Sequence, residues 1–374
     1  MTYRDTVMFL LSGVLGNRSM SLRLLEAAAE RDGKSDSVMW FTPDDYRRFR
    51  APALLRRAST LETAYVARRK LAAYGAAEPS VIFVNGYELA VAARSRFRAA
   101  RLVAALDGTP ALVARLQALV GGPRYRKWAK LPLTMLQHAQ FARLARRVSH
   151  WFPISNWCRD SLVVDYGVAQ SLCTVTRAPQ PRVATMESLR VQPNERPRLL
   201  FVGNDAERKG AKVLLQAFAD RLRTQFELTI VSNDPQVATW TMPQGAVHLS
   251  GLTDPSDIRQ VYHSHDLLVL PTRYDLYPNV ICEGLSQGIP FLATALPGIS
   301  EIAAESGAGW TCGSGAGLVE IETAIREIFL KPDQYARARR NALDYANRLL
   351  RLELLSTALR KVLADVRSGR APIE

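Results

Sequence analysis

Short apolar runs alternate with longer amphipathic segments along most of the chain, and this alternation restricts the fold more than any other feature. In the first half, the runs expected to be strands are 7–11, 38–41, 81–84, 101–106 and 150–155. In the second half they are 198–203, 227–232, 247–251, 266–271 and 290–294. Runs that are apolar on both faces are typical of parallel sheets covered by helices on both sides. The pattern therefore predicts an α/β fold with two doubly wound, Rossmann-like domains.

Apolar residues at helical spacing predict the helices between these strands. The expected helices lie around 17–31, 46–75, 111–121, 125–147 and 156–166, and then at 210–223, 255–263, 279–287 and 316–331. We expect Pro132 to interrupt the segment 125–147. One or two further helices are expected in the last forty residues.

A stretch with four prolines and no apolar period, residues 177–198, predicts a boundary between two domains. A chain of 374 residues is also longer than one ordinary domain. We expect an N-terminal domain at 1–178, a linker at 179–197 and a C-terminal domain at 198–340. The helices at 341–374 could cross back to the N-terminal domain.

The positive charge of the chain is confined to its N-terminal half. The chain has 49 Lys and Arg residues, of which 27 fall within 1–180, and 35 Asp and Glu residues, of which 13 fall there. The remaining residues, 181–374, therefore hold 22 basic and 22 acidic side chains. Seven of the basic residues lie in 123–147, beside Tyr125 and Trp128. This asymmetry indicates an anionic partner, such as a lipid surface, a phosphorylated acceptor or nucleic acid. A solvated, arginine-rich surface is the alternative.

Several classes of protein are disfavoured by what the sequence lacks. No window reaches about 18 uninterrupted apolar residues, the length that a membrane-spanning helix needs. The apolar run after Asp5 predicts a first strand rather than a signal peptide. The four cysteines show no paired spacing and are expected to be buried apolar residues in a reducing compartment. His263 and His265 have no third ligand nearby and are expected to be structural.

Two cations, Arg208 and Lys209, follow the predicted strand that ends at Gly203 and precede a helix that begins after Gly210. At the carboxyl end of a strand and beside a helix N-terminus, they could hold a diphosphate and stabilise charge on a leaving group. An exposed basic turn is the alternative.

Two acids, Asp275 and Glu283, lie eight residues apart around the start of a predicted helix, next to Pro278. Free N–H groups at that helix start could bind an anion. Glu283, one turn into the helix, could accept hydrogen bonds from ribose hydroxyls. Alternatively, Asp275 caps the turn and Glu283 is an acid placed favourably near a helix N-terminus.

The N-terminal half offers two weaker candidates. Gly13, Gly16 and Asn17 form a strand-to-helix turn that could cradle a phosphate, although it lacks the full GxGxxG pattern. Asp107 follows a strand and should face the ligand crevice at a sheet's carboxyl edge. Its alternative role is to cap the following helix.

The segment FVGNDAERKG (201–210), followed by PTRYDLYPNVICEGLSQGIPFLATALPGISEI (271–302), resembles the nucleotide-sugar half of retaining GT-B glycosyltransferases of the group-1, or family 4, type. Lys209 and Glu283 match family positions, whereas Asn204 stands where the family arginine is usual and Asp275 replaces the first Glu of an E-x7-E motif. ISNWCRDSLVVDYGV (154–168) is similar to the end of the family's N-terminal domain. DGTP (107–110) is similar to an acceptor segment of one subgroup.

The resemblance implies a role for each candidate. Asp107, Arg208, Lys209 and Asp275 would be catalytic, with Arg208 supplying the charge absent at Asn204. The remaining candidates would bind substrate: Gly13, Gly16, Asn17, Gly203, Asn204, Leu252, Leu276, Tyr277, Pro278, Asn279, Val280 and Glu283. No metal site and no cofactor are expected, because the nucleoside-diphosphate sugar is a co-substrate and the two cations stabilise its leaving group.

The expected function is a metal-independent, retaining hexosyltransferase that moves a sugar from a UDP- or GDP-sugar to a saccharide or lipid-linked saccharide in glycan or cell-envelope synthesis. Its expected location is cytoplasmic, with a peripheral position at the inner membrane face as an option. The alternatives are a nucleotide-sugar epimerase or phosphorylase on the same fold, and a non-catalytic binder of anionic glycan or RNA. Nucleic acid is not expected, since no RNA- or DNA-binding motif occurs.

Overall fold

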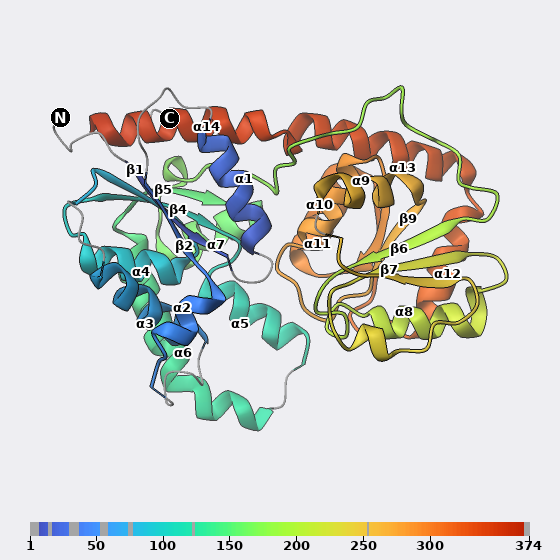
Figure 1. The fold of residues 1–374 in the computed structure, drawn as a ribbon, viewed down its shortest axis with the longest axis horizontal. Coiled ribbons are helices and arrows are strands. Elements are labelled where there is room, and N and C mark those ends of the chain that lie inside the picture. Colours follow the sequence, from blue (N-terminus) through green and yellow to red (C-terminus); the bar gives the residue numbers. More distant parts are fainter. Residues whose placement is uncertain are drawn as a thin grey trace. The chain divides into compact units, whose positions relative to one another are not determined.

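The computed structural model describes residues 7–13, 17–29, 37–52, 59–73, 78–121, 124–252 and 254–369. The chain divides into two compact units. Unit 1 comprises Met1–Arg115, Gly122–Pro179 and Leu352–Glu374, and unit 2 comprises Leu116–Gly121 and Gln180–Arg351. Each unit contains one parallel sheet with helices, so the predicted α/β, doubly wound fold class is confirmed (Figure 1).

The sheet of unit 1 has five parallel strands in the order β2-β1-β3-β4-β5. They are β1 (Val7–Ser12), β2 (Ser37–Phe41), β3 (Val81–Asn85), β4 (Arg101–Leu106) and β5 (Val148–Pro153). Because the order reverses between β1 and β3, a crevice for ligands is expected at the carboxyl ends of these two strands.

The helices of unit 1 differ from the predictions in three places. They are α1 (Asn17–Ala29), α2 (Pro43–Arg48), α3 (Ser59–Ala72), α4 (Tyr87–Arg96), α5 (Pro110–Leu119), α6 (Arg124–Ala145) and α7 (Asn156–Tyr166). The segment 46–75 holds two helices, and α4 was not predicted. The expected interruption at Pro132 is wrong, since α6 continues through it. A proline inside a helix removes one backbone hydrogen bond. Beyond it, α6 is held by buried Phe141, which contacts the rings of Tyr87, Trp151 and Tyr166.

A helix from the far end of the chain completes the core of unit 1. In α14 (Leu352–Ser368), the buried apolar residues recur every three or four positions, and they pack with those of β1, β3, β4 and α1. They are Leu352, Leu355, Leu359, Val362, Leu363 and Val366. Figure 1 shows α14 and α1 on one side of this sheet and α3, α4 and α6 on the other. At about 1.5–3 kcal/mol for each buried large apolar side chain, α14 contributes substantially to the stability of unit 1.

The sheet of unit 2 has six parallel strands in the order β11-β10-β9-β6-β7-β8. They are β6 (Arg198–Val202), β7 (Glu227–Val231), β8 (Ala246–Leu249), β9 (Leu267–Leu270), β10 (Phe291–Thr294) and β11 (Gly309–Cys312). Read from β8, this is the 3-2-1-4-5-6 order of dinucleotide-binding folds, with its switch point between β6 and β9.

The helices of unit 2 include one that was not predicted, α11. They are α8 (Ala211–Ala217), α9 (Pro255–Ser264), α10 (Asn279–Ser286), α11 (Pro297–Ser306), α12 (Leu318–Phe329) and α13 (Pro332–Tyr345). The predicted helix 210–223 is α8 followed by one π-helical turn at Phe218–Leu222, and a second π-helical turn at Ala346–Leu350 follows α13.

The proline-rich stretch 177–198 is tied to unit 2 by a buried carboxylate, Asp266, just before β9. Asp266 accepts hydrogen bonds from Asn194 N at 3.2 Å, Asn194 Nδ2 at 2.8 Å and Arg198 N at 2.8 Å. Its Oδ1 also lies 2.9 Å from Arg190 Nη2. A fully buried acid is stable only when its oxygens are satisfied in this way. From Gln180 onward, this stretch is therefore a fixed part of the surface of unit 2.

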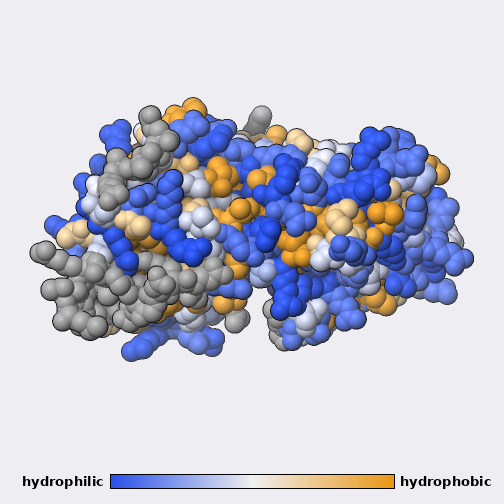
Figure 2. Space-filling model, turned by 90° about the horizontal axis from the view of Figure 1, so that it is seen from above, coloured by the Kyte–Doolittle hydropathy of each residue, from blue (hydrophilic) through white to orange (hydrophobic). Residues whose placement is uncertain are grey.

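Hydrophilic side chains make up most of the face shown in Figure 2, as expected for a chain in which 22% of residues are charged. Within the described residues, no helix combines the length and hydropathy needed to cross a membrane. All four cysteines are free; Cys173 is half-buried and the other three are buried.

Candidate functional site

The loops that follow β6 and β9 meet at the switch point of unit 2 and bring together the central predicted residues. Lys209 Nζ lies 3.8 Å from Asp275 Oδ2, and Arg208 Nη1 lies 3.9 Å from the same oxygen. Arg208 also pairs with Asp205 at 2.5 Å and donates a hydrogen bond to the carbonyl of Tyr274. Arg208 and Lys209 lie 66 residues before Tyr274 and Asp275, respectively, in the sequence. The two loops meet because β6 and β9 are neighbours in the sheet.

Asp275 is the half-buried centre of this cluster, with 17% of its side chain exposed. Burial raises the pKa of its carboxyl, and it outweighs the opposing effects of Lys209, Arg208 and the backbone N–H groups of Tyr277 and Leu276. Loss of solvent disfavours the charged form, whereas cations and N–H donors favour it. An anion bound to the same two cations would raise this pKa further. The contacts to Leu276 and Tyr277 also mean that Asp275 caps its own turn.

Two glycines allow the backbones around the cluster to approach closely. A Cβ on Gly210 would lie 2.1 Å from the Pro271 carbonyl oxygen, and Gly210 has a left-handed φ of 86°. A Cβ on Gly298, in the first turn of α11, would lie 2.0 Å from the Leu276 carbonyl oxygen. The loop at Asp275 is thus clamped between the start of α8 and the start of α11. At Gly203, a Cβ would collide with the Lys209 side chain at 2.5 Å, so Lys209 lies across this glycine.

Glu283 projects from the first turns of α10 and is held by α9. Tyr262 Oη, on a side chain with 1% exposure, donates to Glu283 Oε2 at 3.1 Å. At the start of the same helix, Asn279 Oδ1 is buried with no hydrogen-bond partner among the described residues. An unsatisfied buried acceptor costs about 1–3 kcal/mol, which a ligand hydroxyl could recover. Leu276, Tyr277, Pro278 and Val280 surround these groups, with Tyr277 and Pro278 buried.

The remaining candidates in unit 2 lie on a hydrogen-bonded chain of loops. Asn204 Oδ1 accepts from Asn233 N at 2.9 Å, and Asn233 Oδ1 accepts from Gly251 N at 2.7 Å. The loops after β6, β7 and β8 are therefore linked, and half-buried Leu252 follows directly in the third. In this structure Asn204 positions a loop, while Arg208 is the cation beside Lys209.

The candidates of unit 1 follow the strands of their own sheet and are described separately. Gly13 N donates to Phe41 O at 2.8 Å at the end of β1, and Asn17 is the first residue of α1. The predicted Gly16 lies outside the described residues. Asp107 is exposed after β4. Thr109, not Asp107, caps α5, because Thr109 Oγ1 accepts from Leu112 N at 3.2 Å.

Glu88, in the first turn of α4, is a second acid at this edge that the sequence reasoning missed. Burial, with a smaller contribution from the charge of Asp107, raises the pKa of its carboxyl to about 7. β3 and β4 are parallel neighbours, so the residues that follow them share one edge of the sheet. The rule that selected Asp107, an acid just after an apolar strand, also selects Glu88 after 81–85. By contrast, no sequence signal marks Tyr262 or Gly298, whose roles depend on tertiary packing.

Other titratable groups have structural roles or no partners in a metal site. His265 is buried between Val261 O and Thr229 Oγ1, at 2.6 and 2.8 Å. Over the described ranges, no group of three or more His, Cys, Asp or Glu side chains could hold a metal ion.

Residues 196–330 match the model of a protein family described as "Glycosyl transferases group 1". This confirms the resemblance found in the sequence, and the matched segment contains the cluster at Asp275. A glycogen synthase of Mycobacterium tuberculosis is 22% identical over 281 residues, which cover 70% of this chain and 65% of that protein.

Solved structures share the whole architecture at low identity. Sucrose-phosphate synthase from Thermosynechococcus elongatus matches with a TM-score of 0.72 and 14% identity, covering 98% of this chain and 100% of that one. Anabaena HepE in complex with UDP and glucose matches at 0.66 and 16%, covering 96% and 100%. WaaG, involved in lipopolysaccharide biosynthesis, matches at 0.64 and 16%, covering 97% and 100%. These likenesses establish the GT-B fold.

Proposed function

The chain carries a group 1 glycosyltransferase domain at residues 196–330 on a GT-B fold, and from this premise we propose that the protein is a retaining glycosyltransferase that uses a nucleoside-diphosphate sugar. The observation that carries the proposal is the meeting of Arg208, Lys209 and Asp275 at the switch point between β6 and β9. Structures of HepE in complexes with UDP and with UDP-glucose support a uridine nucleotide as the first donor to test.

The geometry suggests how each group would act on the donor. Arg208 and Lys209 would bind the diphosphate and stabilise the negative charge that develops on it as the glycosidic bond breaks. Glu283, positioned by Tyr262, would accept hydrogen bonds from the ribose. Asp275 would face the transferred sugar. The acceptor hydroxyl would attack from the face that the diphosphate leaves, which retains the anomeric configuration, and a phosphate oxygen would take its proton. With two cations at the leaving group, we propose that no metal ion is needed.

Unit 1 would supply the acceptor site, where Asp107 and Glu88 share one edge of the sheet. A carboxylate or carboxylic acid can bind sugar hydroxyls as an acceptor or a donor of hydrogen bonds. The positive charge of residues 1–180 favours an anionic or lipid-linked saccharide, and glycan or cell-envelope synthesis as the process. We propose a cytoplasmic location, at the inner membrane face when the acceptor is lipid-linked.

Thermal-shift measurements with UDP, GDP and ADP test the donor site. We expect one nucleoside diphosphate to raise the Tm, because a ligand that binds only the folded state stabilises it by RT ln(1 + [L]/Kd). Glu283→Ala should abolish most of this shift, and Tyr262→Phe, which removes only the positioning hydroxyl, should weaken it less. Glu327→Ala, at an exposed position of α12, is the matched control and should keep the full shift.

Two outcomes would contradict the proposal. If no nucleotide changes the Tm, a non-catalytic binder of anionic glycan becomes the better explanation. If the donor is bound but is isomerised or phosphorolysed without a saccharide acceptor, the protein is an epimerase or phosphorylase instead.

Vesicle binding tests the membrane part of the proposal. Substituting Arg126, Lys127 and Lys130 by Gln should weaken binding to anionic vesicles, and added salt should weaken it in the unchanged protein, since screening reduces surface attraction. The same change at Lys331, Arg337 and Arg340 is the control, because these exposed residues belong to unit 2. Equal loss in both variants would show that only total charge matters, and unchanged binding would exclude a role for Arg126, Lys127 and Lys130.

A further inference from the structure

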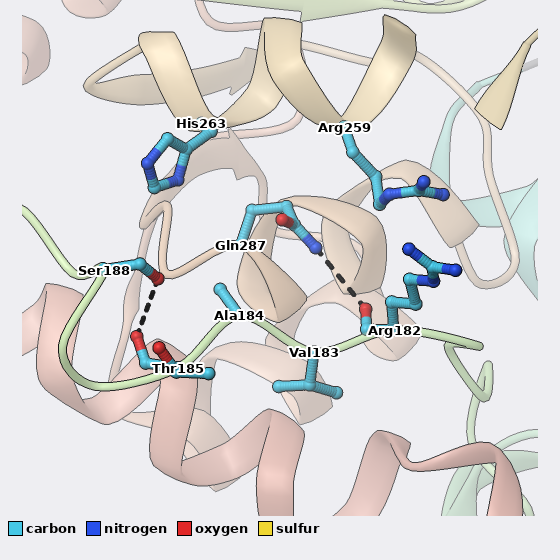
Figure 3. Close-up of a pocket in the computed structure, with 8 residues that line it drawn as sticks. All are labelled: Arg182, Val183, Ala184, Thr185, Ser188, Arg259, His263 and Gln287. Carbon is cyan, nitrogen blue, oxygen red and sulfur yellow. Dashed lines mark hydrogen bonds between the residues drawn. The ribbon is translucent and has the colours of Figure 1, made fainter. Parts of the chain in front are cut away.

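A pocket of about 320 Å³ on unit 2 is lined mainly by basic and neutral polar side chains, with Val183 and Ala184 between them, from three segments of the chain. Arg182, Thr185 and Ser188 come from the proline-rich stretch, Arg259 and His263 from α9, and Gln287 from the end of α10. In Figure 3, the guanidinium groups of Arg182 and Arg259 reach toward the same end of the pocket, and the ring of His263 stands at the other.

The pocket lies away from the proposed donor site. The loops at Lys209 and Asp275 are at the carboxyl ends of β6 and β9, where α10 begins. Gln287 follows the last residue of α10, so the eight-residue helix separates it from that edge by about 12 Å at 1.5 Å per residue. Ligands of doubly wound folds usually bind at the carboxyl edge, so the fold itself does not account for a basic pocket at the opposite edge.

The lining of the pocket carries more positive than negative charge. Its eight lining residues include no acid, and the nearest exposed carboxylate in sequence, Glu187, hydrogen-bonds to the side chain of Thr185 at its rim. Among the described residues, neither Arg182 nor Arg259 forms an ion pair with a carboxylate, although Arg259 is close enough to Asp254 to lower the pKa of that exposed acid. By contrast, Arg190, Arg198 and Arg208 on the same unit each pair with an acid. Two neighbouring guanidinium groups repel each other, and a dianion between them would remove that repulsion.

The backbone that carries Arg182 is held in place. Gln287 Nε2 donates to Arg182 O at 3.4 Å, and Ala184 N donates to Ser286 O at 2.8 Å. Two hydrogen bonds thus fix the segment 182–184 to the end of α10, while α9 fixes Arg259 and His263 one helical turn apart. Guanidinium groups on fixed supports suit the bidentate binding of phosphate oxygens.

We propose that this pocket is a second anion site of the protein, which binds the phosphate group of inorganic phosphate or of a phosphomonoester. Arg182 and Arg259 would each donate two hydrogen bonds to oxygens of the phosphate group. His263 and the hydroxyl of Ser188 would bind the same group from the other side. The site is built only from residues of unit 2, and it does not depend on whether the protein transfers sugars.

Histidine-labelled NMR on the full chain can observe this site directly, because the chain has only five histidines. The His263 signal is assigned from His263→Gln. Titration with sodium phosphate at constant pH, against chloride at matched ionic strength, should shift this signal saturably. Arg182→Gln/Arg259→Gln should weaken the phosphate affinity at least tenfold, and an unchanged His265 signal would verify that this variant is folded. Arg337→Gln/Arg340→Gln should retain the affinity.

A second comparison separates this site from the donor site. Lys209→Ala should leave the phosphate response of His263 intact even if nucleotide binding is lost. Tighter binding of phenyl phosphate than of inorganic phosphate would assign the site to a monoester, and the reverse would assign it to the free ion. The proposal is overturned if chloride shifts His263 equally, if the double arginine variant binds as well as the unchanged protein, or if Lys209→Ala alone removes the response.

Discussion

Asp275 combines two properties that act in opposite directions on its charge: its side chain is only 17% exposed, and its carboxyl lies 3.8 and 3.9 Å from two cations. The raised pKa shows that burial outweighs the cations in setting its charge. A bound diphosphate would share Arg208 and Lys209 with this acid, so the negative charge of Asp275 should oppose diphosphate binding while still serving the sugar.

Asp275→Asn should therefore separate binding from turnover. Removing the charge should lower the Kd for the nucleoside diphosphate several-fold, and kcat should fall by about a hundredfold, the usual loss when one preorganised polar group is removed from an active site. Calorimetry and steady-state kinetics give the two values. Asp275→Glu keeps the charge and should keep the weaker binding. If Asn leaves kcat unchanged, Asp275 serves only to cap its turn.

The raised pKa of Glu88 predicts that stability falls as pH rises, which is opposite to the effect of most acids. Its pKa rises from 4.5 in the unfolded chain to about 7 in the fold. Between these values the unfolded state loses its proton first, so the free energy of unfolding decreases as pH rises from about 4.5 to 7 and then levels off. Glu88→Gln should remove this loss, and the stability of the variant relative to the unchanged protein should increase between pH 5 and pH 8.

Urea unfolding at these two pH values measures the difference, which we expect to be on the order of 1–3 kcal/mol. Asp107→Asn is the control for the source of the shift. Because burial is the larger cause and the charge of Asp107 is the smaller one, this variant should reduce the pH dependence only partly. An equal effect of the two variants would show that the pair, and not burial, sets the pKa.

At the scale of elements, the start of α11 holds the Asp275 loop through a contact that only glycine permits. Gly298→Ala would place a methyl group 2.0 Å from the Leu276 carbonyl oxygen, so the loop or the helix must move. We expect a loss of roughly 1–3 kcal/mol in stability and a larger loss in nucleotide affinity. Gly317→Ala is the control, since among the described residues no atom lies within 4 Å of the position that its methyl group would take. Wild-type nucleotide affinity in Gly298→Ala would contradict the clamp.

The helix α14 offers a matched test of its contribution to unit 1. Leu363→Ala, at a position with 0% exposure, should lower the free energy of unfolding by about 2–5 kcal/mol. Leu354→Ala, on the same helix at 48% exposure, should change it by less than about 0.5 kcal/mol. Denaturant titration followed by circular dichroism compares the two. Similar losses in both variants would mean that α14 contributes helix content and not core packing.

The elements that the sequence predicted are those with a strong apolar pattern. All ten predicted strands are present, whereas β11 was missed because this short edge strand is only partly buried and has no apolar run. Arg208, Lys209, Asp275 and Glu283 could be selected because each stands next to a strand or helix end. Tyr262 and Gly298 could not, since one acts through a buried hydrogen bond across two helices and the other through the atom it lacks.

On the scale of the whole molecule, the four residues proposed to act on the donor, Arg208, Lys209, Asp275 and Glu283, all belong to unit 2. The fragment Gln180–Arg351 contains all six strands of the second sheet together with Asp266 and its partners. We expect it to fold alone and to bind the nucleoside diphosphate within about tenfold of the affinity of the full chain, since domains with their own core are autonomous. Chemical denaturation and calorimetry test both points. A folded fragment that binds no nucleotide would show that unit 1 contributes to the donor site.

Unit 1 has no such independence, because its core includes residues from both sides of unit 2 in the sequence. During synthesis, the strands of unit 1 are made first. Their core stays incomplete until Leu355, Leu359 and Leu363 of α14 have been synthesised, which happens only after unit 2. Domains usually fold in their order of synthesis. Here we expect the order to be inverted, because the second sheet can finish folding while the first still exposes an apolar face. We therefore expect chaperones to bind the N-terminal half during synthesis.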